Sequence, residues 1–238
     1  APGIYNFDCM PYESIMLGQY SIWQGPENHI CAELGVQKKN EICLGYSRDG
    51  FHFSRPSHDP FMANDQSEGA WNWGNMQSVG GVPLVVGDSL YFYASGRRLN
   101  KIMWDSYTST GLAMLRRDGF VSKHAGAEGA QLTTEVLTFD GSFLFVNAEI
   151  KTSLRIDLLT PAGKVMASFE SGPVNSTKLC LGNVGKYKGK QVRLRFTASD
   201  CDIYSFWISP WQTGESRGYM AGGGPGLSPS GIDVPNLL

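Results

Sequence analysis

The stretch WNWGNMQSVGGVPLVVGDSLYFYASGR, residues 71–97, decides the fold class. It holds two runs rich in β-branched and aromatic residues, Val82–Val86 and Ser89–Ser95, with Gly87-Asp88 between them. A two-residue turn of this kind between two such runs is the usual short-range sign of a β-hairpin. We therefore predict strands on both sides of this turn, in a chain built from short strands and tight turns.

A short phrase supports the same interpretation, because it occurs twice. Arg-Asp-Gly-Phe stands at 48–51 and again at 117–120, 69 positions apart, and each copy follows an apolar run. The recurrence predicts a supersecondary unit used twice, with Asp49 and Asp118 in its turns. An insertion over 96–109 accounts for the long spacing, since a propeller blade takes about 40 to 50 residues.

Two such units suggest about two blades of a β-propeller. Each blade reads as strands that meander outward. In the first they are the buried strand Ser14–Trp23, then 41–47 after a polar, Pro-containing stretch over 25–40, and 51–56 after the turn at Asp49. Two blades cannot close a ring, and their open strand edges need a cover. We therefore expect a companion N-terminal chain or segment that completes the propeller.

Composition favours a globular all-β protein. The 238 residues are 42% apolar and 18% charged, with 29 glycines and no uninterrupted helical apolar stripe. The formal net charge of −2, with scattered Lys and Arg, does not favour nucleic acid as a partner. No apolar run approaches the ~20 residues of a membrane-spanning helix, so we expect no membrane partner either.

The pattern changes near Ala130. The segments 132–139 and 143–148 read as one hairpin around Asp140-Gly141, and 154–159 with 165–169 as a second. Two further strands, 191–197 and 203–208, complete a set typical of a compact β-sandwich.

Alternation within 191–197 predicts how that sandwich is packed. Val192, Leu194 and Phe196 face one side, and Arg193 and Arg195 face the other.

We accordingly predict three segments: propeller blades over 1–125, a β-sandwich over 126–211, and a Gly/Pro-rich tail over 212–238. The tail has little to bury, so it is either a loose arm or packed on a neighbour.

The cysteines leave two alternatives open. Five of them are spaced too widely for a metal knuckle and read as ordinary thiols in strands. In a secreted protein, Cys180 and Cys201 on neighbouring strands are the pair best suited to a disulfide. Asn175-Ser176-Thr177 is a glycosylation sequon, which fits the secreted protein that we expect. The first residue is Ala rather than Met, so we expect either that a leader was removed or that the chain starts inside a longer precursor.

Neither a metal nor a cofactor is indicated. The four histidines lack metal-ligand spacing, and the glycine-rich run 222–226 precedes no helix that would bind a phosphate.

Several blocks together resemble a known enzyme group. They are YNFDCMPYESIMLGQYSIWQG (5–25), EICLGYSRDGFHFSRP (41–56), GAWNWGNMQSVGG (69–81), VVGDSLYFYASGR (85–97) and TGLAMLRRDGF (110–120). Over residues 4–209 the chain resembles the C-terminal half of five-bladed propeller proteins of glycoside hydrolase families 32 and 43. In the family-32 type the propeller is followed by a β-sandwich, which matches the change near Ala130.

The resemblance implies hydrolysis of O-glycosyl bonds by paired carboxylates. In such propellers the catalytic set comes mainly from the first three blades, whereas this chain looks like the last two. A family-type strand start carrying the nucleophile is absent from it. The resemblance therefore implies that this chain supplies one wall of a sugar pocket and a supporting sandwich, without the complete catalytic set.

Two carboxylates are candidates for catalysis. Asp8 and Glu13 flank the start of the strand expected to lie innermost in the first blade, where side chains point toward the propeller axis. Each is interpreted as a general acid or a sugar-hydroxyl acceptor, or else as a turn cap or ion-pair partner.

The second blade supplies candidates for substrate binding. Trp71 and Trp73 offer flat apolar faces for a sugar ring, or else pack between blades. Asn75 and Gln77 read hydroxyls through amides that both donate and accept. Arg97 is placed to hold an acidic sugar or a catalytic carboxylate, or to form a structural ion pair.

Two classes of function follow. The first is part of a carbohydrate-active hydrolase, completed by an N-terminal companion. The alternative is a non-catalytic carbohydrate-binding, lectin-like or structural propeller protein.

Overall fold

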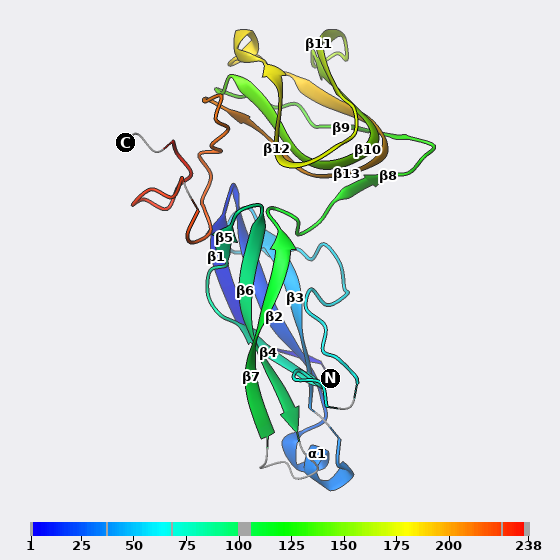
Figure 1. Ribbon diagram of the computed structural model, residues 1–238, viewed down its shortest axis with the longest axis vertical. Helices are drawn as coiled ribbons and strands as arrows, with labels where there is room; N and C mark the ends of the chain where they lie inside the picture. Colours follow the sequence, from blue (N-terminus) through cyan, green and yellow to red (C-terminus); the bar gives the residue numbers. More distant parts are fainter. Residues whose placement is uncertain (1, 37, 68, 100–105, 225, 236–238) are drawn as a thin grey trace. The chain divides into compact units, whose positions relative to one another are not determined.

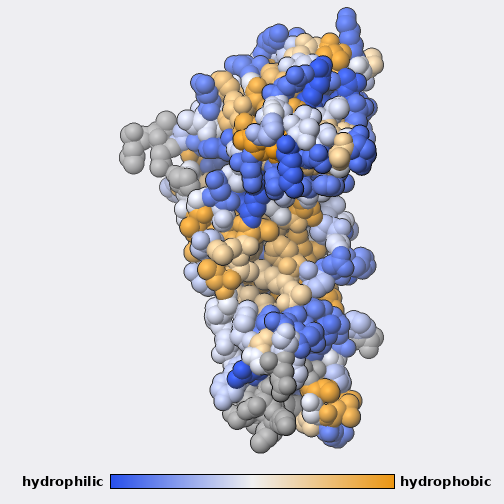
Figure 2. All heavy atoms as spheres, turned by 45° about the vertical axis from the view of Figure 1, so that its right-hand side comes forward, coloured by the Kyte–Doolittle hydropathy of each residue, from blue (hydrophilic) through white to orange (hydrophobic). Residues whose placement is uncertain are grey.

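The computed structural model describes residues 2–36, 38–67, 69–99, 106–224 and 226–235, and it is built almost entirely from strands (Figure 1). This confirms the all-β prediction. The chain divides into two compact units, which we call unit 1 (1–114 and 218–227) and unit 2 (115–217 and 228–238). On the side seen in Figure 2, hydrophobic as well as hydrophilic residues reach the surface of both units. No helix in the described ranges is long and apolar enough to cross a membrane.

Unit 1 is one seven-stranded sheet with the order β1-β2-β3-β4-β6-β5, and β7 also pairs with β6. Its elements are β1 (Gly3–Tyr12), β2 (Ile15–Gly25), α1 (Asn28–Leu34), β3 (Lys39–Ser47), β4 (Asn75–Val79), β5 (Leu84–Val86), β6 (Ser89–Leu99) and β7 (Ser106–Arg116). The predicted hairpin forms, since β5 and β6 pair across the turn at 87–88. A single sheet therefore runs through both expected blades, and their division into blades stays a prediction.

Among the strand pairs of this sheet whose register the described residues give, β3 and β4 have the shortest ladder. These two strands run parallel and share one ladder pair, Asn40 with Asn75. The side-chain amide of Asn64 reinforces the joint by donating to the backbone oxygens of Asn40 and Gly74. A joint of so few bonds separates at lower cost than the long antiparallel ladders beside it.

Three local expectations for unit 1 were wrong. The strand β1 was not recognised, and α1 lies in what we took for an irregular stretch. The segment 51–56 is no strand, because it joins the sheet only through a bridge between Tyr46 and Ser54. The insertion that we expected over 96–109 is largely strand instead, because β6 extends to Leu99 and β7 begins at Ser106. Residues 100–105 lie outside the described residues.

The turn role of Asp49 is confirmed. Its carboxylate accepts hydrogen bonds from the backbone N–H groups of Phe51 and His52, at 2.9 and 2.8 Å, and from the Ser47 hydroxyl. These hydrogen bonds hold the pKa of Asp49 well below its usual range. The largest contribution is that of the His52 backbone N–H, followed by the His52 ring. Asp118 adopts a positive φ of 57° in the second turn.

Unit 2 is a six-stranded sheet dominated by two strands of 17 residues each, β10 and β13. Its elements are β8 (Lys123–Ala125), β9 (Ala130–Thr133), β10 (Phe143–Leu159), β11 (Val165–Ser171), β12 (Val174–Asn183), a 3-10 turn (Gly185–Tyr187) and β13 (Arg193–Ser209). Here β10 pairs with β13 along its length, and with β12 and then β11 on its other side.

The two halves of this sheet share one core. Leu144 and Val146 from the first half of β10 and Ile156 and Leu158 from the second belong to the same buried cluster. The register shifts between Ile150 and Ser153, where the long strands change neighbours. The sheet thus bends so that both halves bury the same apolar side chains, and the finer assignment as a β-sandwich stays a prediction.

The predicted hairpin around Asp140-Gly141 is wrong, because β9 pairs with β13 rather than with β10. The segments 143–148 and 154–159 are one strand, as are 191–197 and 203–208 in their greater part. No Gly or Pro separates the members of either pair, so the backbone continues through a bulge instead of turning. Within β13, Leu194 and Phe196 are buried as expected.

The cysteines form no disulfide, so the Cys180–Cys201 alternative is wrong. Cys180 lies opposite Phe145 and Cys201 opposite Ile150, on the two strands that flank β10. Cys31, Cys43 and Cys201 are buried thiols, and burial raises the pKa of Cys201 to about 11.

The sequon residue Asn175 lies in strand β12 rather than in a turn. Its side-chain oxygen accepts a hydrogen bond from Arg116. Glycosylation at this position stays a prediction.

The tail from 212 onward is no loose arm over its described residues. Val85 N–H donates to Gly222 at 2.7 Å in unit 1, and Ser216 N–H donates to Asp233 at 2.8 Å in unit 2. These contacts fit the alternative of a packed tail.

Candidate functional site

One face of the unit 1 sheet is covered by the segment that connects β3 to β4. The ring of Phe53 lies 4.8 Å from that of Phe7, and Phe61 lies 5.8 Å from Phe92. Further along, the Trp71 ring packs on Gly96, with no room for a Cβ atom there. The segment thereby serves as a second layer on this side of the sheet.

The opposite face carries polar side chains on five strands, together with apolar ones such as Ile42 and Leu44 on β3. Gln19, Ser21 and Trp23 alternate along β2, so they point to the same side. Residues directly opposite one another in register also share a side. This extends the set to Asn6 and Asp8 on β1, Asn40 on β3, Asn75 on β4 and Arg97 on β6, and we call these eight side chains the polar face.

Much of the polar face is buried, but many of its buried polar atoms make no hydrogen bond. Gln19, Ser21, Asn40 and Asn75 are at most 7% exposed. Within the described part of the chain, nine buried side-chain N or O atoms lack a hydrogen-bond partner, and eight of them belong to this face. They are Asn6 Oδ1, Gln19 Nε2, Ser21 Oγ, Trp23 Nε1, both Asn40 amide atoms, Asn75 Oδ1 and Arg97 Nε.

Unit 2 shows that this is not a general property of the protein. Its fully buried Asn147 accepts from Arg116 Nε at 2.7 Å and donates to the Arg117 carbonyl at 2.6 Å. Ser209, also fully buried, donates to the Glu215 carbonyl at 2.7 Å. A buried polar group without a partner typically lowers the stability of a protein by ~1–3 kcal/mol. Eight such atoms on one face are therefore expected to pair with a ligand or with bound water.

The sheet curls over the polar face. The amide of Gln77 on β4 lies 3.4 Å from the hydroxyl of Tyr5 on β1, although β2 and β3 separate these strands in the sheet. Lys38 Nζ lies over the Tyr5 ring, 4.3 Å from its centroid. The curl explains why polar side chains are buried without a second layer above them.

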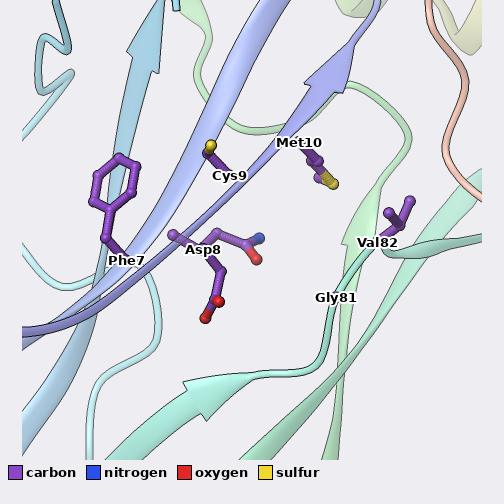
Figure 3. A pocket seen from close by; sticks show the side chains of 7 residues that line it. Phe7, Asp8, Cys9, Met10, Gly81 and Val82 are labelled. Carbon is purple, nitrogen blue, oxygen red and sulfur yellow. The ribbon is translucent and has the colours of Figure 1, made fainter. Parts of the chain in front are cut away.

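A pocket of about 220 Å³ opens at the β1 end of the polar face. Figure 3 shows the Asp8 side chain extending from β1 into the space beside the segment that carries Gly81 and Val82. The lining residues are Phe7, Asp8, Cys9, Met10, Gln19, Gly81 and Val82. The polar face therefore reaches an accessible cavity through Asp8 and Gln19.

The structure brings some of the predicted site residues together. Asp8, Asn75 and Arg97 belong to the polar face, with Asn75 and Arg97 as direct cross-strand partners. Gln77 lies on the same strand as Asn75 and reaches Tyr5. Whether these residues bind a substrate stays a prediction.

Glu13 lies apart from the pocket lining. It follows the end of β1 with a positive φ of 50°, and its backbone exchanges two hydrogen bonds with Tyr219. Its carboxylate lies against Gly218, so close that a Cβ atom there would overlap it. This places the Glu13 side chain beside the returning tail.

Trp71 and Trp73 also lie outside the pocket lining. Trp71 packs on Gly96 and Gly111, where added Cβ atoms would stand 2.3 and 2.2 Å from its ring. Trp73 is half-buried and lies in the turn before β4, where its backbone N–H donates to the Ala70 carbonyl. For Trp71 the packing alternative therefore has direct geometric support.

We expect Gly96→Ala to destabilise unit 1 by ~1–3 kcal/mol, because its Cβ would overlap the Trp71 ring. In a Trp71→Ala background the same change should cost less, since the ring is gone and only the Cβ atom of Asn72, at 2.9 Å, still obstructs the added Cβ. Urea unfolding of the four variants measures this coupling. Equal costs in both backgrounds would show that Trp71 does not pack there.

Sequence reasoning missed Gln19, Ser21, Trp23 and Asn40. The signal was present, because Gln19-x-Ser21-x-Trp23 places polar groups on alternate positions of a strand otherwise expected to be buried. What the sequence did not give was the pairing of Trp23 with Asn40 and of Asn40 with Asn75, which depends on the long-range register.

A cluster in unit 2 does not have the geometry of a nucleophile triad. Ser122 Oγ and His124 Nδ1 both contact Asp202 Oδ1, at 3.0 and 3.1 Å. In a triad the histidine lies between the serine and the carboxylate, whereas here both compete for one oxygen.

Comparison with known proteins leaves the family open. Neither the protein-family models nor the curated proteins include a match to this chain. Among solved structures, it is similar to a glycoside hydrolase family 43 arabinoxylan arabinofuranohydrolase from Bacillus subtilis, crystallised in complex with cellotetraose. The TM-score is 0.28 at 10% identity, over 86% of this chain and 53% of that enzyme chain.

The chain thus spans about half the length of the enzyme chain it matches. At this TM-score and identity, the likeness establishes neither a family nor an activity.

Proposed function

We propose that unit 1 binds a neutral carbohydrate on its polar face, entering from the pocket beside Asp8. The observation that carries this proposal is the set of eight buried N and O atoms without partners. Most of them are amide, hydroxyl or indole groups, which pair with the hydroxyls of a sugar. A phosphate or nucleic acid would instead favour a cluster of Arg and Lys.

The chemistry favours binding over hydrolysis. Hydrolysis of a glycosidic bond generally uses two carboxylates on opposite sides of it. Of the described residues that line the pocket, Asp8 alone has a carboxylate. Unit 1 is therefore proposed as a sugar-binding wall, and hydrolysis would need a further carboxylate from a companion segment.

The deeper amides need a route to the ligand, because Asn40 is fully buried. The weak joint between β3 and β4 provides one, since Asn40 and Asn75 form its single ladder pair. Sugar hydroxyls or the waters they carry would reach these amides as the joint loosens.

The test is hydrogen exchange on the intact protein with a panel of neutral oligosaccharides, namely cello-, xylo-, arabino- and fructo-tetraose. Binding is expected to slow amide exchange in β2, β3 and β4, and to raise the melting temperature with sugar concentration. Peptides of unit 2 should exchange at unchanged rates. The proposal fails if no oligosaccharide binds, or if protection is confined to unit 2.

A further inference from the structure

The geometry points to the pocket beside Asp8 as a subsite for one neutral sugar ring, held through two adjacent hydroxyls by Asp8 and Gln19. This inference rests on the proposed function, and it adds the chemical group that is recognised and the residues that recognise it.

The two polar residues are positioned by the strand ladder itself. Asp8 on β1 and Gln19 on β2 are directly opposite in register, so their side chains leave the sheet side by side. Asp8 is exposed, whereas Gln19 is only 4% exposed and its Nε2 has no partner among the described residues. A buried donor thus stands next to an accessible carboxylate, and both line the same cavity.

A third polar group fixes the carboxylate. Asn6 Nδ2 donates to Asp8 Oδ2 at 3.0 Å, while the buried Asn6 Oδ1 has no partner. Asp8 Oδ1 is the oxygen that this bond does not engage. A hydroxyl both donates and accepts, so one hydroxyl of a diol can donate to Asp8 while the next accepts from Gln19 Nε2.

The rest of the lining fits the carbon skeleton of a sugar. Met10 and Val82 offer apolar surface to C–H groups, and Gly81 adds no side chain. About 220 Å³ is below the roughly 300–1,000 Å³ of pockets for drug-sized ligands, which suits a single ring.

Charge selects the kind of ring. Asp8 is the only charged residue among the described lining residues, and Arg97 is not one of them. A uronic acid would place its carboxylate near that of Asp8, which is unfavourable in a partly enclosed site. The subsite therefore takes a neutral sugar, and the acidic sugar that we considered for Arg97 is not expected here.

The experiment compares Asp8→Asn with wild type in the intact protein, using ligand-observed NMR and calorimetry. The probes are methyl glycosides of glucose, xylose, galactose and arabinose, their 2-deoxy and 3-deoxy analogues, and galacturonic acid. For the best neutral glycoside we expect Kd to rise about 10–100-fold in Asp8→Asn, because a hydrogen bond to a charged group is lost. One deoxy analogue should lose affinity for wild type yet show little further loss in Asp8→Asn.

The matched control is Glu33→Gln, which removes one negative charge from an exposed position in α1. It should leave the affinity unchanged. Because Asp8 is exposed, its substitution should not disturb folding, and a second variant, Gln19→Met, tests the donor with a side chain of similar length.

The possible outcomes separate the two proposals. If neutral sugars bind but the affinity is the same in Asp8→Asn and Gln19→Met, the subsite is wrong while the polar face still binds carbohydrate. If galacturonic acid binds more tightly than the neutral glycosides, the selection for neutral rings is wrong. If no probe binds at all and the tetraoses also fail, both proposals are wrong.

Discussion

Asn40→Leu is expected to stabilise unit 1 while it weakens carbohydrate binding. The Asn40 side chain is fully buried, and neither its nitrogen nor its oxygen has a partner among the described residues. Leucine has a similar shape and no polar atoms to desolvate. The substitution should therefore add ~1–3 kcal/mol to the free energy of unfolding, the usual cost of an unpaired buried polar group.

Binding should change in the opposite direction. If Asn40 pairs with sugar hydroxyls, leucine leaves those hydroxyls unpaired on a buried surface, which should weaken binding at least ~10-fold. A residue that costs stability and supports binding is typical of a functional site. If a residue instead stabilises the fold, the same substitution lowers the free energy of unfolding.

The matched control is Asn64→Leu. Asn64 is also buried, but its amide donates to the carbonyls of Asn40 and Gly74 at 3.3 and 3.2 Å. The same substitution there should lower the stability of unit 1 by ~1–3 kcal/mol, because the Asn40 and Gly74 carbonyls each lose one hydrogen bond, although Gly74 keeps that from the Asn40 N–H. Hydrogen exchange resolved by peptide measures both effects within unit 1.

Opposite signs for the two asparagines would support the polar face as a binding site. A loss of stability in Asn40→Leu equal to that in Asn64→Leu would mean that Asn40 already has partners, such as tightly held water. The unpaired atoms would then no longer support a ligand site.

The sequence predicted what depends on local chemistry. The Gly87-Asp88 turn and the flanking β5 and β6 follow from turn residues beside β-branched runs. Asp49 fulfils its predicted turn role because its carboxylate bonds backbone N–H groups only two and three residues away. Such contacts are fixed within a few positions, so one sequence is enough to recognise them.

Long-range pairing was beyond the reach of those patterns. The segments 143–148 and 154–159 were read as two strands because each alternates well, but nothing local shows that β10 continues between them. The candidate site shows the same limit. Asp8 and Asn75 were recognised as polar groups near strand starts and Arg97 as one that follows a strand. The place of Asn40 in the polar face appears only when β2, β3 and β4 are paired.

Asp157→Ala is expected to have the largest effect on the stability of unit 2. This carboxylate is at the centre of three strands, with Ser168 on β11 and Arg195 on β13 as its direct neighbours in register. Its side chain is 3% exposed and accepts from Arg195 Nη2 and Ser168 Oγ, both at 2.6 Å, and from Arg155 Nε at 2.9 Å. Removing it takes an acceptor from Arg195, Ser168 and Arg155, although Arg155 keeps Glu170. Water also reaches both partly exposed guanidinium groups, so we expect a cost of about 2–4 kcal/mol, since a hydrogen bond to a charged group contributes ~1.5–3 kcal/mol.

A nearby ion pair provides the control. Glu170 lies 2.8 Å from Arg155 Nη1 on the same face, but its side chain is 67% exposed. Exposed pairs are screened by water and contribute at most ~1 kcal/mol. Glu170→Gln should therefore change the unfolding of unit 2 very little, and a loss as large as that of Asp157→Ala would contradict the argument from burial.

The pH dependence follows from the same contacts. Burial by itself would raise the pKa of Asp157, but hydrogen bonds from Ser168, Arg195 and Arg155 outweigh it and hold the pKa below the ordinary value. A carboxyl whose pKa is lower in the folded state stabilises the fold above its unfolded pKa of about 3.9. That contribution is lost as the pH falls through the lower folded pKa. Urea unfolding between pH 7 and pH 2 should therefore show that the free energy of unfolding falls less at acidic pH in Asp157→Asn than in wild type. If it falls equally in both proteins, Asp157 is not responsible for the acid sensitivity.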